Sequence, residues 1–212
     1  SSRMFANACS VNRPSRHALV LLLLAALAGC ATVPDAVDLP SIGSWQARNE
    51  ILGQLDAWQF KGRIAVKAGD DGFNARFDWS QDGDAFAATV SGPLGIGTVR
   101  IAGDGDSVTL TDKDGVESRL DDVEAELQWR YGWTIPVDSL RYWALGIPDP
   151  AVPGVTELDN QDRLLRLEQS GWAVEISRYA EGGGQSMPRV LTAKNHETRV
   201  RMVIDRWLFF DN

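Results

Sequence analysis

Apolar and polar residues alternate along most of the chain from Phe60 onward. The alternation is clear in residues 73–79, where Phe73, Ala75, Phe77 and Trp79 are separated by polar side chains. It recurs in residues 64–66, 86–90, 99–101, 108–110, 165–167, 172–176 and 200–204. A period of two places the apolar residues on one face of a strand. We therefore predict a curved antiparallel sheet of about ten or eleven strands that is apolar on one face.

Three other stretches have the period of a helix. The apolar stripes of the first two are Trp45, Ile51, Leu52, Leu55 and Trp58 within residues 42–58, and Leu120, Val123, Leu127 and Tyr131. The third carries Leu140, Trp143 and Ala144; Asp138 can cap it, and Gly146 followed by Pro148 ends it. The expected fold class is mainly β (α+β), one sheet with a few helices against its apolar face.

Residues 1–29 have a different pattern. Arg13, Arg16 and His17 precede a leucine-rich apolar run from Ala18 to Ala28, and the segment contains no acidic residue. A basic region, a short apolar region and small residues before a cleavage site are typical of a secretory signal. The run is about half as long as the roughly 20 residues that cross a bilayer as a helix. We therefore expect residues 1–29 to be a removed signal peptide.

The run ends in Leu27-Ala28-Gly29-Cys30, which resembles the lipobox of bacterial lipoproteins. The resemblance implies cleavage before Cys30 and a lipid anchor on Cys30; an ordinary secretory signal with an incidental cysteine is the alternative. Stable attachment needs several acyl chains, because each buried CH₂ contributes only about 0.8 kcal/mol. The next residue is Ala31 rather than aspartate. By the same resemblance, the protein is anchored in the outer membrane and faces the periplasm.

The rest of the chain divides simply. Residues 30–41 carry the lipidated cysteine and two prolines without an apolar period, so we expect a tether; its residues 31–41 reach about 35 Å when extended. Residues 42–212 are expected to form a single domain. Within it, the glycine-rich segment 181–185 is interpreted as a mobile loop.

Composition restricts the chemistry of the mature chain. Three of the 21 basic residues lie in residues 1–29, which leaves 18 basic and 29 acidic side chains. This excess of acid argues against nucleic-acid binding, which depends on neutralising phosphates. Cys9 leaves with the signal, Cys30 is lipidated, and His196 is the one histidine that remains. We therefore expect no disulfide, metal site, cofactor or histidine-based catalytic triad.

Several motifs resemble the LolB family. Residues 136–148, PVDSLRYWALGIP, resemble the family's P-L-x-x-L-R-x-W-x-L-G-x-P stretch, with Val137 in place of the common leucine. Gly92-Pro93-Leu94-Gly95 is similar to its N-P-L-G turn, with Gly92 in place of asparagine. Residues 75–79 are similar to its A-R-F-x-W strand, and residues 200–207 resemble its last strand.

The resemblance implies a half-barrel of about eleven strands with helices as a lid over an apolar cavity. It also implies a function without covalent chemistry. A LolB-like protein accepts lipoproteins from a soluble periplasmic carrier similar to LolA, binds their acyl chains, and releases them into the lipid of the outer membrane. We expect the protein to do this as a monomer.

Leu94 and Pro93 are the predicted membrane insertion loop. They lie in a glycine-rich connection where a side chain has little to cover it, and the family carries its protruding apolar residue at this position. A turn leucine that folds back onto the core is the alternative. Arg141, in the strongest motif, either contacts the carrier or forms a salt bridge across its helix.

Five aromatic residues lie on the apolar phase of their strand or helix. They are candidates for the wall of an acyl-chain cavity or for an ordinary filled core: Phe77, Trp79, Phe86, Trp143 and Trp172.

Two other functions remain as alternatives. A lipid-anchored structural or assembly subunit of the outer membrane would use the sheet as a scaffold and bind no acyl chains. A lipid hydrolase would need a nucleophile with a base, but the sequence has no G-x-S-x-G motif and His196 lies in a polar segment.

Overall fold

The computed structural model describes residues 35–92, 97–132 and 134–211. Eleven strands of this part form one open antiparallel sheet, in the order β6-β5-β4-β3-β2-β1-β11-β10-β9-β8-β7. The strands are β1 (Ala57–Ala68), β2 (Asp71–Asp82), β3 (Ala85–Ser91), β4 (Val99–Gly103), β5 (Val108–Thr111), β6 (Glu117–Leu120), β7 (Gly154–Leu158), β8 (Leu164–Gln169), β9 (Trp172–Gly182), β10 (Gln185–Lys194) and β11 (Thr198–Phe209). The described helices are α2 (Trp45–Gly53), α3 (Val123–Tyr131) and α4 (Val137–Leu145). The predicted fold class and number of strands are confirmed.

The first and last strands of the sequence are neighbours at the centre of the sheet: β1 pairs with β11 on one side and with β2 on the other. Alternate residues of β1 point to opposite faces, as the period of two requires. Trp58, Phe60 and Ile64 are buried on the inner face, whereas Arg63 and Lys67 are exposed on the outer face.

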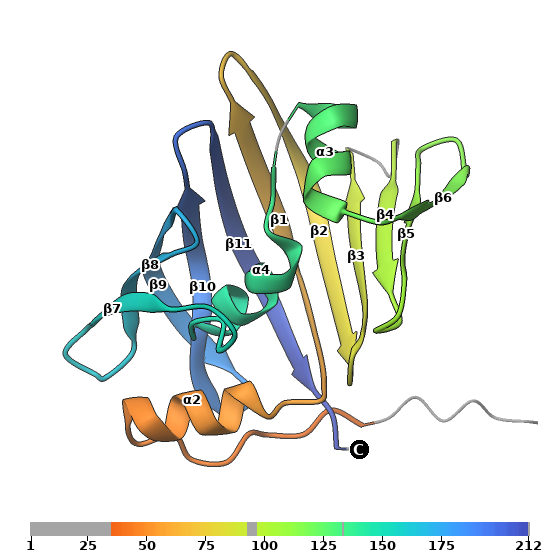
Figure 1. Cartoon of the computed structure of the whole chain (residues 1–212). Helices are drawn as coiled ribbons and strands as arrows, with labels where there is room; N and C mark the ends of the chain where they lie inside the picture. Colours follow the sequence, from red (N-terminus) through yellow and green to blue (C-terminus); the bar gives the residue numbers. More distant parts are fainter. Residues whose placement is uncertain (1–34, 93–96, 133, 212) are drawn as a thin grey trace, which may run out of the picture. The chain divides into compact units, whose positions relative to one another are not determined.

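Helices α3 and α4 lie over the inner face of the sheet, and α2 runs across one end of it (Figure 1). Helix α4 buries Leu140, Trp143 and Ala144, the stripe that the sequence predicts. It ends at Gly146, which has a φ of 79°, so the predicted end is confirmed. The predicted cap is wrong: Pro136 occupies the cap position, no side chain caps the helix, and Asp138 lies in its first turn.

The other two helices are shorter than their apolar stripes. The Ser44 side chain accepts a hydrogen bond from the Ala47 N–H and starts α2, which ends before Trp58. Trp58 belongs to β1, and Leu120 belongs to β6 rather than to a helix. Both residues are buried by the sheet, so their apolar spacing fits a helix only by coincidence. The short strands β6 and β7 have no clear alternation and were not individually predicted.

Part of the predicted tether is folded onto the sheet. The Val37 N–H donates to the Phe209 carbonyl and the Leu39 N–H to the Gly183 carbonyl, each at 2.8 Å. Leu39 is buried in the core.

Gly183 and Gly184 form a two-residue turn between β9 and β10, so the interpretation of residues 181–185 as a mobile loop is wrong. A Cβ at Gly183 would lie 2.4 Å from the Phe209 ring, which explains the glycine.

Residues 35–212 form a compact unit with its own core, so we expect this body to fold without the preceding residues. No helix among the described residues is long and apolar enough to span a membrane. The predicted signal peptide, Cys30, Pro93 and Leu94 lie outside the described residues.

Candidate functional site

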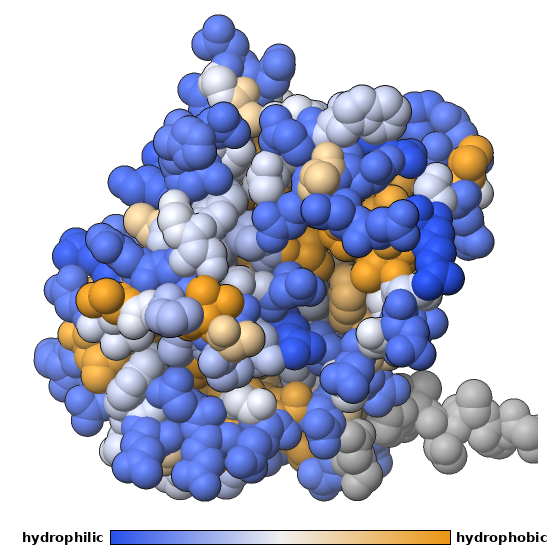
Figure 2. Space-filling view, in the orientation of Figure 1, coloured by the Kyte–Doolittle hydropathy of each residue, from blue (hydrophilic) through white to orange (hydrophobic). Residues whose placement is uncertain are grey.

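A cavity of about 370 Å³ lies between the inner face of the sheet and α4. Its apolar wall includes Trp79 from β2 and Phe86 from β3, whose rings stack with their centroids 5.2 Å apart. Val108, Leu120 and Val137 complete this wall. The volume falls within the range of about 300–1,000 Å³ that is usual for ligand pockets. Figure 2 shows the hollow in this face, with hydrophobic residues deep within it and hydrophilic residues around it.

Acidic side chains surround the apolar wall. The carboxylates that line the cavity belong to Asp84, Asp106, Asp121, Asp138 and Asp149, and the lining includes one basic residue, Arg141. Asp149 is buried and accepts hydrogen bonds from the Ser139 hydroxyl at 2.8 Å and the Ala151 N–H at 2.9 Å. The site therefore combines an apolar interior with a negatively charged mouth.

The lid helices add to this negative charge. Glu124 lies in the first turn of α3, and Asp138 lies in the first turn of α4. Burial raises the pKa of the Glu124 carboxyl, and the Asp122 and Asp138 carboxylates raise it further. The carboxylates in the first turns of the two helices therefore lie close enough to repel one another.

Arg141 stands between two hollows. It lines the cavity and also a second hollow of about 250 Å³ between α2, α4 and the turn after β2. Its guanidinium lies 4.6 Å from the centroid of the Tyr142 ring and donates to the Tyr142 hydroxyl at 2.5 Å. Among the described residues it has no salt bridge, so the predicted salt bridge across the helix is wrong.

The structure separates the five predicted aromatic residues into two groups. Trp79 and Phe86 line the cavity, and the ring of Phe77 lies 6.4 Å from that of Trp79. Trp143 and Trp172 contact each other, with centroids 6.1 Å apart, and neither lines this cavity. Trp143 has no exposed surface. Trp79 and Phe86 thus border an open space, Phe77 packs behind Trp79, and the second group packs within the core.

Two buried glutamines were missed by the sequence reasoning. Gln81 accepts a hydrogen bond from the Trp79 indole N–H at 3.1 Å, and Gln169 accepts one from the Trp143 indole N–H at 2.9 Å. Each lies on the inward phase of its strand, near the end of that strand. A polar residue on the apolar phase was the signal that could have identified them.

Comparison with known proteins gives the family. The sequence model described as "Outer membrane lipoprotein LolB" matches residues 56–207. The chain belongs to the LolB family. Two relatives named outer-membrane lipoprotein LolB, from Ectopseudomonas mendocina and Nitrosococcus oceani, are each 35% identical to it. In each case the match covers 91% of this chain and 96% of the relative.

Solved structures agree with the fold. A LolA superfamily protein from Nitrosomonas europaea superposes with a TM-score of 0.52 at 10% identity, over 81% of this chain and 96% of that protein. At this identity the likeness concerns the fold alone. Membership of the LolB family confirms the predicted resemblance and the predicted location, that of a lipoprotein of the outer membrane.

Proposed function

We propose that the protein accepts lipoproteins from a soluble periplasmic carrier and inserts them into the outer membrane, and that it holds their acyl chains in the cavity beneath α4. The cavity wall of Trp79 and Phe86 is the observation that carries this proposal. An acyl chain gains by leaving water for such a wall, at roughly 25 cal/mol per Å² of apolar surface. The scaffold alternative predicts a filled core without such a space.

The transfer involves no covalent step, so its direction comes from relative affinity. A preference of about 1.4 kcal/mol for this protein over the carrier gives a tenfold bias. Cys30 carries the lipid anchor, and Leu94 with Pro93 contacts the bilayer when the acyl chains are released. The protein acts as a monomer, and its partners are a carrier similar to LolA, the acyl chains, and the lipid of the outer membrane.

An apolar fluorescent probe tests acyl-chain binding directly. The unlipidated chain from Ala31 onward should raise the fluorescence of the probe, and a diacylated lipopeptide should displace it. Phe86→Glu should weaken binding about tenfold or more, because a carboxylate facing the apolar wall loses hydration. Val155→Glu introduces the same charge at a side chain that is 72% exposed, and it should bind like the wild type.

The scaffold alternative gives a different result. If the wild-type body binds neither the probe nor the lipopeptide, the acyl-chain function is wrong and a structural role takes its place. If Phe86→Glu and Val155→Glu bind equally well, the cavity beneath α4 is not the binding site. Circular dichroism of each variant shows whether the fold is retained.

A further inference from the structure

The outer face of the sheet carries a concentration of positive charge in an acidic protein. Six exposed basic residues lie on four adjacent strands, β10, β11, β1 and β2. We call them the basic outer patch: Arg63, Lys67, Arg76, Lys194, Arg199 and Arg201. The formal charge of the whole chain is −8, so this patch is not a consequence of composition.

The register of the strands places like charges directly opposite one another. Lys67 is paired with Arg199, which is in turn paired with Lys194. Arg63 is paired with Arg76. Like charges in directly opposite positions destabilise a sheet. A row of cations across three strands therefore costs stability, which points to a role outside the fold itself.

Most of these cations have no partner among the described residues. Arg63 forms a salt bridge to Asp205 at 3.1 Å. Within the described part of the chain, no hydrogen bond or ion pair engages the side chains of Lys67, Arg76, Lys194, Arg199 or Arg201. The acidic residues nearby include Asp70 in the turn after β1 and Asp71 at the start of β2. The patch remains positive on balance and accessible to an anion.

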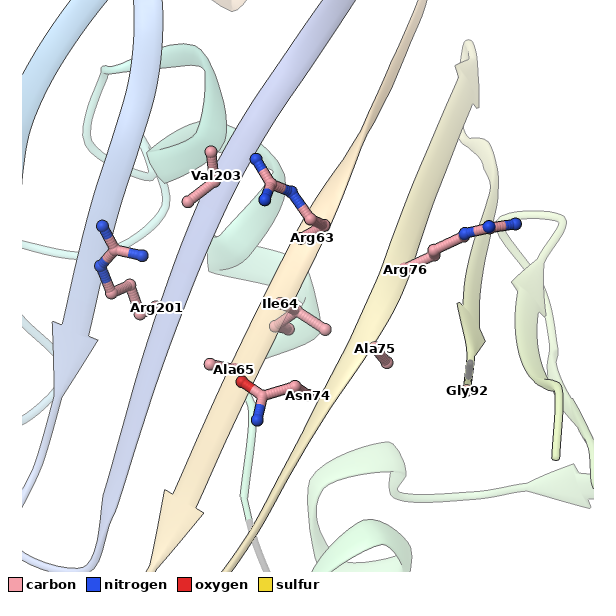
Figure 3. Close-up of a pocket in the computed structure, with 9 residues that line it drawn as sticks. All are labelled: Arg63, Ile64, Ala65, Asn74, Ala75, Arg76, Gly92, Arg201 and Val203. Carbon is pink, nitrogen blue, oxygen red and sulfur yellow. The ribbon is translucent and has the colours of Figure 1, made fainter. Parts of the chain in front are cut away.

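Two shallow hollows run through the patch. One, of about 380 Å³, is lined by Arg63, Arg76 and Arg201 with Ala65 and Asn74. Figure 3 shows the small Ala65 side chain beside Asn74 near its centre and the three arginine side chains spread around them, on neighbouring strands. The second, of about 450 Å³, shares Arg201 and Ala65 and adds Lys67 and Arg199. Together they form a shallow groove with Ala65 in its floor and cations along its rim.

We propose that the basic outer patch binds the anionic phospholipid headgroups of the membrane to which the protein is attached. Guanidinium groups bind phosphates through paired, charge-assisted hydrogen bonds. Clusters of about four to eight basic residues beside a membrane are typical of anionic-lipid binding. The family location keeps a bilayer permanently within reach of the body.

The patch fits a lipid surface better than a protein partner. Protein interfaces usually have an apolar or aromatic core. The large exposed hydrophobic residues of the described part, which are Val116, Trp129, Tyr131 and Val155, all lie outside the patch. The cations instead spread over four strands, a width of roughly 14 Å, with shallow hollows between them.

The charges of the two faces give this contact an orientation. The helices and the acidic mouth of the cavity lie on the inner face, opposite the basic outer patch. An anionic bilayer attracts the outer face and repels the cavity mouth. The bound body would thus present its cavity to the periplasm. This inference rests on the membrane location and not on acyl-chain binding.

Vesicle co-sedimentation tests the proposal. The unlipidated chain from Ala31 onward should bind vesicles of phosphatidylcholine mixed with phosphatidylglycerol more tightly than vesicles of phosphatidylcholine alone. Each basic residue near an anionic surface raises the affinity for the membrane about fivefold. The double variant Arg76→Thr/Arg201→Thr should therefore lose about tenfold or more of the binding. High salt should abolish the preference, because the screening length falls from about 10 Å at 0.1 M to about 3 Å at 1 M.

A control double variant removes two positive charges outside the basic outer patch. Arg119→Thr/Arg166→Thr changes exposed residues on β6 and β8 and should bind almost as the wild type does. Arg76→Thr relieves its repulsion with Arg63, so its thermal midpoint should equal or exceed that of the wild type. Equal binding to both vesicle types, wild-type binding by the patch variant, or equal losses in both double variants would each overturn the proposal.

Discussion

Gln81 and Gln169 hold two tryptophans in defined positions, Trp79 of β2 and Trp143 of α4. The side-chain amide of Gln169 also donates to the carbonyls of Asp149 and Val152, at 3.0 and 2.7 Å. It thereby connects β8, α4 and the segment after α4. A buried indole N–H requires an acceptor, and each glutamine supplies one without a buried charge. Rigid tryptophans beside the cavity and beneath the lid follow from these bonds.

Replacing Trp143 by phenylalanine tests this role. Trp143→Phe keeps an aromatic ring but removes the indole N–H and leaves a small void, so we expect the free energy of unfolding to fall by about 1–3 kcal/mol. Urea unfolding of the body measures the change. Trp129→Phe is the matched control, because Trp129 is 79% exposed and should change stability by less than about 0.5 kcal/mol. Equal effects of the two changes would argue against the hydrogen-bonded role of Trp143.

Leu94 belongs to the release step of the proposed function. Leu94→Glu should leave uptake from the carrier nearly intact but block delivery, because a glutamate must lose hydration where a leucine gains by burial. In an assay with carrier, protein and liposomes, lipoprotein should accumulate on the variant. Wild-type delivery by Leu94→Glu would make Leu94 an ordinary turn residue. Failed uptake with an intact fold would place Leu94 in the carrier-docking surface instead.

At the scale of elements, the turn between β7 and β8 is fastened by one carboxylate. Asp159 accepts hydrogen bonds from the Arg163 guanidinium at 2.6 and 2.8 Å and from the Gln161 and Arg163 backbone N–H groups. Arg163 in turn stacks 4.3 Å from the Tyr179 ring on β9 and donates to the Ser186 hydroxyl on β10. One turn therefore connects four strands near the β7 edge of the sheet.

This turn should make stability depend on pH. Burial acts to raise the pKa of Asp159, but the hydrogen bonds from Arg163 and the backbone outweigh it and hold the pKa below its ordinary value. The ionised Asp159 carboxylate therefore stabilises the fold at pH values above its pKa in the unfolded chain, which is near 4. This stabilisation is lost as the pH falls from there through the lower pKa of the folded state. Asp159→Asn should cost about 1–2 kcal/mol at pH 7 and progressively less below about pH 4. Unfolding curves at several pH values measure the difference, and a constant difference would contradict this account.

At the scale of the whole molecule, the open sheet separates its functions between two faces. The helices and the cavity lie on the inner face, and the basic outer patch lies on the other. Residues 37–39 are hydrogen-bonded at the end of the sheet where β9 meets β10, close to the last residues of β11. Any anchor on the preceding residues therefore attaches to a defined corner of the body.

The anchor itself is tested by Cys30→Ala. The lipid supplies the stable membrane attachment in the proposed function, and electrostatic contacts of the body are weaker and sensitive to salt. The variant should therefore be found as an unprocessed precursor or be released from the outer membrane by a high-salt wash. Cell fractionation decides the outcome. A variant that is processed at the same site and stays in the outer membrane after the wash would show that the anchor is elsewhere.

The period-two strands, the third helix with its end at Gly146, and the family can all be predicted from the sequence, because each depends on local spacing or on a contiguous motif. The place of Trp58 and Leu120 in strands cannot be predicted in this way, since their burial comes from residues distant in the sequence. The same holds for the cavity. Trp79 and Trp143 each lie on the apolar phase of their own strand or helix, yet Trp79 borders the cavity and Trp143 is enclosed in the core. The opposed cations of the outer face likewise come from strand register, which pairs residues far apart in the chain.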